Sequence, residues 1–85
     1  MNVSLVLAAD SVSPELTPAD RDAYLDAVAG AIGATYPRTV SIIVATGPDA
    51  SCYVEGCDNP DGMARDIVRL ADAVYNDPTG YGWAA

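Results

Sequence analysis

The chain has 85 residues and contains no histidine and no lysine, while twelve acidic residues outnumber four basic ones. Its formal net charge is -8 at pH 7 and its pI is ≈ 4.1. Histidine is the usual proton carrier near neutral pH and a common metal ligand, and lysine supplies Schiff bases and phosphate contacts. Their absence excludes most catalytic centres and most surfaces that bind nucleic acid directly.

Hydrophobic residues make up 51% of the chain, so we expect a folded core despite the charge. A single domain is expected over residues 1–78, followed by an aromatic C-terminal tail over 79–85. No window approaches the ~20 apolar residues of a membrane-spanning helix, and no basic segment precedes the first apolar run. We therefore expect a cytoplasmic protein that does not contact membranes.

The two cysteines, Cys52 and Cys57, are not spaced as a C-x-x-C redox pair. Two thiols without histidine cannot complete a structural zinc site, which needs about four ligands. They could meet in a disulfide only if the chain folds back at Gly56. We expect free thiols that pack as small apolar side chains.

Catalysis by this chain would have to depend on a cysteine without a histidine base or on paired carboxylates. The closest acidic pairs are Asp20 with Asp22 and Asp58 with Asp61. Both pairs fall where helices are expected to begin, and aspartate at such positions serves the cap and the helix dipole. We expect no enzyme, no cofactor and no metal.

The first predicted element is a β-strand over 2–9, with Val3, Leu5 and Leu7 on one face. Because the other face is also fairly apolar, we expect this strand at the centre of a sheet. After a loop over 10–16, a helix is expected to begin at Pro18 with Thr17 as N-cap and to end before the next proline. Its predicted buried stripe is Leu25, Val28, Ile32 and Tyr36.

Two further strands are predicted over 39–45 and 51–55. In the first, Val40, Ile42 and Val44 share a face. In the second, Cys52 and Val54 share a face and Tyr53 lies on the other. The turn chemistry of 46–50 favours pairing of these two strands as a hairpin.

A second helix is predicted to begin at Pro60, capped by Asn59 or Asp58, and to end near 76–78. Its buried stripe is expected at three- and four-residue spacing, at Met63, Ile67, Leu70 and Val74. The outward positions are expected to mix both charges, at Asp61, Arg65, Asp66, Arg69 and Asp72.

The order β-α-β-β-α predicts a two-layer α/β fold, with two helices packed on one face of a three-stranded mixed sheet. The other sheet face, with Val6, Ile43 and Tyr53, then has no helix over it. Two alternatives remain open: this face contacts a partner, or the tail aromatics cover it. Trp83 likewise either docks on its own fold, which we favour, or contacts a partner.

The acidity has two explanations, namely solubility and the habitat of the organism, or a surface that meets a basic partner. Acids along helices can imitate a phosphate backbone and so occupy the nucleic-acid site of another protein. The candidates lie on the two predicted helices: Asp20, Asp22, Asp26, Asp58, Asp61, Asp66, Asp72 and Asp77.

The layout resembles the DinI-like proteins, which are small acidic modulators of the RecA recombinase filament. The resemblance depends on the β-α-β-β-α order, on Tyr36-Pro37 followed by Val40-Ser41-Ile42, on Cys52-Tyr53-Val54, and on Trp83 near the C-terminus. It implies that the second helix presents an acidic ridge to the recombinase. The ridge would consist of Asp61, Asp66, Asp72 and Asp77.

These observations lead to the hypothesis of a non-enzymatic, acidic, DNA-mimic-like modulator that docks on a nucleic-acid-binding protein. The expected contacts are Asp61, Asp66, Asp72 and Asp77, with Tyr53 and Trp83 as apolar anchors. The partner would be a recombinase, or a CRISPR effector if the chain is a phage-encoded anti-CRISPR-type inhibitor. A further alternative is a structural subunit that forms a homodimer through its open sheet face.

Overall fold

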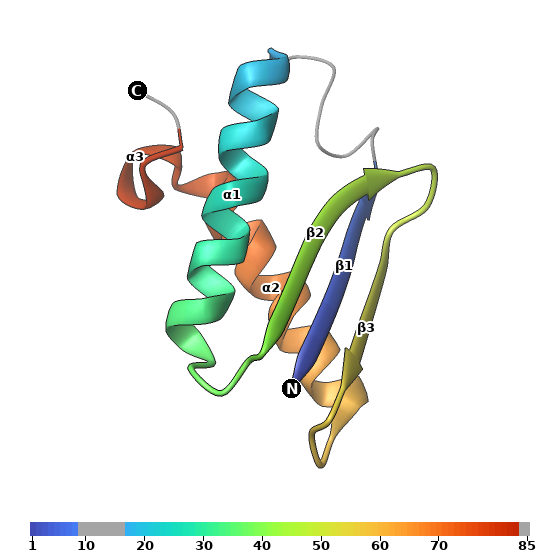
Figure 1. The fold of residues 1–85 in the computed structure, drawn as a ribbon. Helices are drawn as coiled ribbons and strands as arrows, with labels where there is room; N and C mark the ends of the chain where they lie inside the picture. The colour runs from blue at the N-terminus through green and yellow to red at the C-terminus, as the bar shows by residue number, and fades with distance from the viewer. Residues whose placement is uncertain (9–16, 84–85) are drawn as a thin grey trace.

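The computed structural model describes residues 1–8 and 17–83 of the chain. Its elements are β1 (Asn2–Ala8), α1 (Pro18–Thr35), β2 (Ser41–Gly47), β3 (Ser51–Glu55), α2 (Pro60–Asn76) and α3 (Pro78–Tyr81). Helices α1 and α2 cover one face of the sheet (Figure 1), which confirms the predicted two-layer α/β fold. The predicted loop over 10–16 lies outside the described residues.

The three strands form one mixed sheet in the order β2-β1-β3. Strand β1 runs parallel to β2, with Val3 beside Ile42, and antiparallel to β3, with Val3 beside Val54. The predicted central place of β1 is confirmed, and its core-facing side chains Val3 and Leu5 are 2% and 1% exposed. An apolar strand thus gains a neighbour on each edge.

The predicted hairpin of β2 with β3 is wrong, because β1 lies between these two strands. Residues 48–50 connect them, so the chain does reverse where the turn chemistry indicated. Three extended residues reach about 10 Å, which is enough to cross two inter-strand spacings of about 4.8 Å over the end of β1. Turn residues thus predicted the reversal but not which strands are neighbours.

Helix α1 begins as predicted, with Pro18 in its first turn and the Thr17 side chain accepting a hydrogen bond from the Asp20 backbone N–H at 3.1 Å. Its fully buried residues are Tyr24, Val28 and Ile32. The predicted stripe is therefore shifted, since Leu25 and Tyr36 are only half-buried and Tyr24 was not expected in the core.

Helix α2 is capped by Asn59, whose side-chain oxygen accepts from the Gly62 N–H at 3.2 Å. It ends at Asn76, within the predicted range. Ile67 and Val74 are fully buried as predicted, and Ala71 joins them. The other two predicted core residues, Met63 and Leu70, are half-buried against the core. None of the described helices is both long and apolar enough to cross a membrane.

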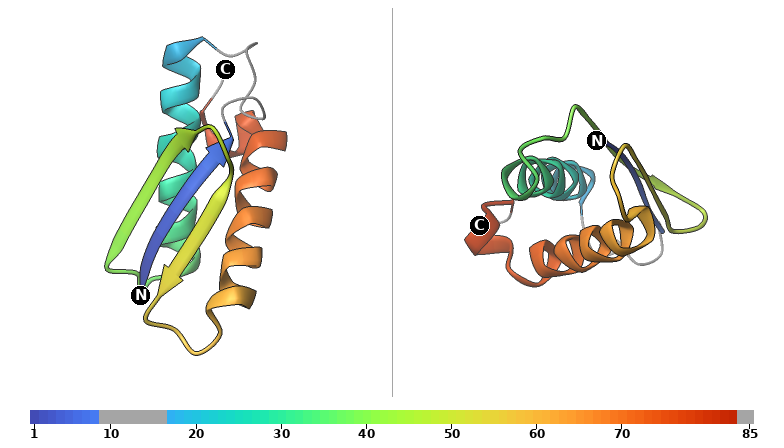
Figure 2. Two further views of the ribbon diagram at one scale, coloured as in Figure 1. Left: turned by 90° about the vertical axis from the view of Figure 1, so that its right-hand side faces the viewer. Right: turned by 90° about the horizontal axis from the view of Figure 1, so that it is seen from below.

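No described helix or strand covers the sheet face away from α1 and α2, as the view with the strands in front of the helices shows (Figure 2). Ile43 and Tyr53 on this face are 57% and 64% exposed. Val40 was expected to share the core side of β2 with Ile42 and Val44, and this is wrong. It precedes the strand and is 85% exposed.

Trp83 docks on its own fold as expected, on the helix layer and not over the open sheet face. Its ring centroid lies 5.1 Å from that of Tyr24 and 6.0 Å from that of Tyr75. The indole N–H donates to the Val74 carbonyl at 2.6 Å, and the Tyr24 hydroxyl donates to the Ala71 carbonyl at 3.0 Å. Two aromatic donors thus hold the end of α2 against α1 and the short helix α3.

Replacing Trp83 with alanine should lower the free energy of unfolding by about 3–5 kcal/mol, because it removes a buried ring and its hydrogen bond. Urea unfolding followed by circular dichroism measures this loss. Tyr81→Ala is the matched control, since Tyr81 is 41% exposed on α3, two residues before Trp83, and its replacement should cost less than about 1 kcal/mol. Equal losses in the two variants would contradict a core role for Trp83.

Candidate functional site

The two long helices run antiparallel, and this decides which charges meet. Tyr24, early in α1, hydrogen-bonds Ala71, late in α2. At the other end, Tyr36 after α1 and Asn59 before α2 line the same groove. The start of α1 therefore lies beside the end of α2, as the left view in Figure 2 shows.

This arrangement gathers carboxylates at one end of the helix layer, which we call the acidic end. It consists of Asp20, Asp22, Asp26, Asp72 and Asp77. All are exposed except Asp20, which is partly exposed. Arg21 lies among them, and Arg69 lies one turn before Asp72. Five carboxylates against these two cations leave this end strongly negative.

The carboxylates of the acidic end do not all have the same freedom. The Asp77 side chain caps α3 by accepting from the Gly80 N–H at 3.1 Å. Asp20 lies in the first turn of α1, where its negative charge interacts favourably with the positive end of the helix dipole. Asp22, Asp26 and Asp72 have exposed side chains with no hydrogen bond among the described residues. These three are the carboxylates most available to a partner.

The charge of Asp72 also affects the ionisation of Tyr24 in the core behind it. Burial raises the pKa of Tyr24 to about 12, and the negative charge of Asp72 adds to the shift. Both effects disfavour the phenolate, so the hydroxyl remains a donor to the Ala71 carbonyl across the physiological range. The core group next to the acidic end, the Tyr24 hydroxyl, is therefore neutral and hydrogen-bonded.

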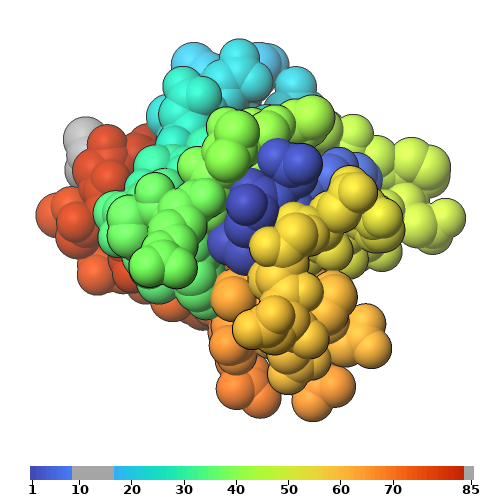
Figure 3. Space-filling model, turned by 60° about the horizontal axis from the view of Figure 1, so that its bottom comes forward, coloured from blue at the N-terminus to red at the C-terminus, as the bar shows by residue number. Residues whose placement is uncertain are grey.

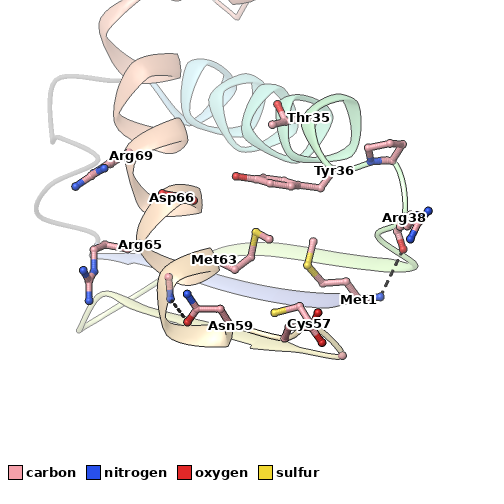
Figure 4. A pocket seen from close by; sticks show the side chains of 14 residues that line it. Met1, Thr35, Tyr36, Arg38, Cys57, Asn59, Met63, Arg65, Asp66 and Arg69 are labelled. Atoms are coloured by element: carbon pink, nitrogen blue, oxygen red, sulfur yellow. Dashed lines mark hydrogen bonds between the residues drawn. The ribbon is translucent and has the colours of Figure 1, made fainter.

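The opposite end of the molecule has a different character. A groove of about 830 Å³ lies between the end of α1, the N-terminus of the chain and the start of α2 (Figures 3 and 4). We call it the arginine groove, because three of the four arginines line it: Arg38, Arg65 and Arg69. Asp58 and Asp66 line it as well, and these two carboxylates offset only part of the positive charge of the three arginines.

The interior of the arginine groove is largely apolar. Met1, Met63 and Cys57 extend into it, and the Tyr36 ring lies across its upper part (Figure 4). Arg65 and Arg69 point away from Tyr36, on the far side of α2. Burial raises the pKa of the Tyr36 hydroxyl, and nearby Asp66 adds to this shift. The guanidinium groups thus form an outer rim and do not fill the groove.

The acids predicted on the second helix do not form one continuous ridge. Asp61 and Asp66 lie in the first half of α2 with Arg65 between them in sequence, whereas Asp72 and Asp77 belong to the acidic end. Opposite charges one turn apart weaken the field of the first half. The structure instead unites the last part of α2 with the α1 candidates Asp20, Asp22 and Asp26.

The two predicted apolar anchors do not join this surface. Tyr53 lies on the open sheet face, on the opposite side of the sheet from α2. Trp83 is 7% exposed and its N–H is already bonded, so its ring offers no surface to a partner in this conformation. No local pattern in the sequence indicates the acidic end, because that end depends on how α1 and α2 pack against each other.

The cysteines are free thiols, as expected, and both are half-buried. Burial raises the pKa of Cys52, which favours its neutral thiol. Within residues 1–8 and 17–83, no group of three or more cysteine, aspartate or glutamate side chains is arranged to hold a metal ion.

Comparison with known proteins adds no family to this description. No protein-family model matches the chain, and no curated protein sequence matches it significantly.

The burial of Tyr24 predicts a loss of stability at high pH. Its folded pKa, about 12, lies above the ordinary value of 10.0, so the unfolded chain loses this proton first. The raised pKa contributes to the free energy of unfolding below pH 10, and this contribution of about 2–3 kcal/mol should be lost as the pH rises from 10 to 12. Urea unfolding between pH 8 and 11.5 measures it.

Tyr24→Phe is the control for this pH dependence. It should cost about 1 kcal/mol at pH 8 through the lost hydrogen bond, but its stability should fall less steeply above pH 10. Equal slopes for the variant and the wild type would contradict the assignment to Tyr24.

Proposed function

We propose that the protein is a non-enzymatic modulator that docks its acidic end onto the basic, nucleic-acid-binding site of another protein. The observation that carries the proposal is the separation of charge along the helix layer. Among the described residues, five carboxylates lie at one end together with Arg21. Arg38 and Arg65 lie around the groove at the other end, and Arg69 lies between the two ends. A net charge of -8 spread evenly would produce no such preferred docking end.

The physical basis is electrostatic steering. The negative field of the acidic end attracts a basic surface and orients it before contact, which raises the association rate. Asp22 and Asp26 lie one turn apart on α1, with their Cβ atoms about 5–6 Å apart. Such a row of exposed carboxylates offers a basic site a negative surface in place of phosphates. Binding should therefore compete with nucleic acid and weaken with salt.

The resemblance to the DinI-like proteins suggests a recombinase as one partner. In those proteins the second helix presents the acids, whereas here Arg65 and Arg69 lie on that helix. We therefore assign the main contact to the acidic end, which draws on α1 as well. A CRISPR effector is the other partner to test, since it also binds nucleic acid through a basic channel.

The test compares three immobilised baits in a bacterial lysate that contains the candidate partners. They are the wild type, Asp22→Asn/Asp26→Asn/Asp72→Asn at the acidic end, and Glu55→Gln/Asp58→Asn/Asp66→Asn around the arginine groove. Both variants lose three exposed charges, so their net charge is the same. Retained proteins are eluted with duplex DNA or RNA, and then with salt, and are identified by mass spectrometry.

The proposal predicts a nucleic-acid-binding protein that the wild type and the groove variant retain and that nucleic acid releases. The acidic-end variant should hold it at least about tenfold more weakly at 0.1 M salt. Equal retention by the two variants would contradict the assignment to the acidic end. Failure of nucleic acid to release any bound protein would contradict the mimicry.

A further inference from the structure

Strand β2 has one edge paired with β1, and its other edge is unpaired within the described part of the chain. Its seven residues, SIIVATG, contain no charge and no proline. Edge strands are commonly protected against pairing with another chain by charged residues, proline or a short length. Strand β2 has none of these protections over its full extent. It therefore presents a row of unpaired backbone donors and acceptors.

Most side chains of β2 are apolar on both faces of the sheet, which is typical of a strand with neighbours on both edges. On the open face, Ile43 is 57% exposed. On the core face, Ile42 and Val44 are only half-buried, although their neighbours on β1 are 1–2% exposed. The hydrophobic core is thus incompletely covered along this edge, and one more strand would cover it.

We propose that a second copy of this chain supplies that strand, by antiparallel pairing of the two β2 edges about a twofold axis. The result is a six-stranded sheet in which the two three-stranded sheets become continuous. Ile42 of each copy would lie beside Val44 of the other, and these side chains would extend the core across the axis. Each copy would also satisfy the unpaired backbone groups of the other.

Charge favours a second copy at this place. Arg38 lies just before β2 and Asp49 just after it, and both side chains are exposed. Antiparallel pairing brings the start of one strand beside the end of the other, so Arg38 of each copy approaches Asp49 of its neighbour. The twofold axis forms this contact twice. Figure 4 shows Arg38 pointing away from the arginine groove, which leaves it free for such a contact.

The strength of the dimer follows from its size and from the charge of the chain. Pairing of one seven-residue edge buries less than the roughly 1,200 Å² of a stable interface, so we expect association at about 10 μM to 1 mM. Two copies of charge -8 repel each other, and salt screens this repulsion. The dimer should therefore strengthen with salt, whereas docking of a basic partner on the acidic end should weaken.

Sedimentation equilibrium of the whole chain from about 10 μM to 1 mM, at 0.05 and 0.5 M NaCl, tests the proposal. The wild type should dimerise, and more strongly at the higher salt. Ile43→Lys places a charge on β2 and should weaken the dimer at least about tenfold. Tyr53→Lys is the matched control on the same sheet face, and it should weaken the dimer less than about threefold.

A monomer at 1 mM at both salt concentrations would overturn the proposal. Equal weakening by Ile43→Lys and Tyr53→Lys would also overturn it, because that result indicates stacking of the open sheet faces. If Ile43→Lys does not fold, Arg38→Asp and Asp49→Arg provide the second test. Each alone should weaken the dimer, and the double variant should restore it; no restoration would contradict the pairing direction.

Discussion

The arrangement of the molecule depends on two hydrogen bonds that aromatic side chains make to the end of α2. Tyr24 donates to the Ala71 carbonyl and Trp83 donates to the Val74 carbonyl. Together with Tyr75, these rings fill the space between α1, α2 and α3. They fix the antiparallel alignment of the two long helices. That alignment places the start of α1 beside the end of α2 and so creates the acidic end.

The sheet contributes a second constraint, because β1 is shared between β2 and β3. Its central position buries Val3 and Leu5 almost completely but leaves two edge strands of different character. Strand β3 is short and ends in Glu55, whereas β2 is longer and uncharged. The surface thus has two distinct regions, the acidic end of the helix layer and the uncharged edge strand β2. The first favours a basic partner, and the second favours another copy of the chain.

Local chemistry was enough to predict much of the fold. The caps Thr17 and Asn59, the prolines that follow them and the core residues Val28, Ile67 and Val74 are set by contacts within one helix or by its period. The strand neighbours and the burial of Tyr24 depend on contacts between distant segments, so the hairpin prediction was wrong and the buried stripe predicted for α1 was shifted. The acidic end was missed for the same reason, because its charges come from two helices whose packing the sequence pattern does not specify.

The most direct test of the account is a map of where a basic ligand contacts the protein. We would record ¹⁵N–¹H correlation spectra while adding a short oligoarginine peptide at low salt. If the acidic end binds basic ligands, the largest shifts should fall on the first half of α1 and on the last turn of α2, and they should vanish when salt is added. Shifts concentrated around the arginine groove, or spread evenly over the surface, would contradict it.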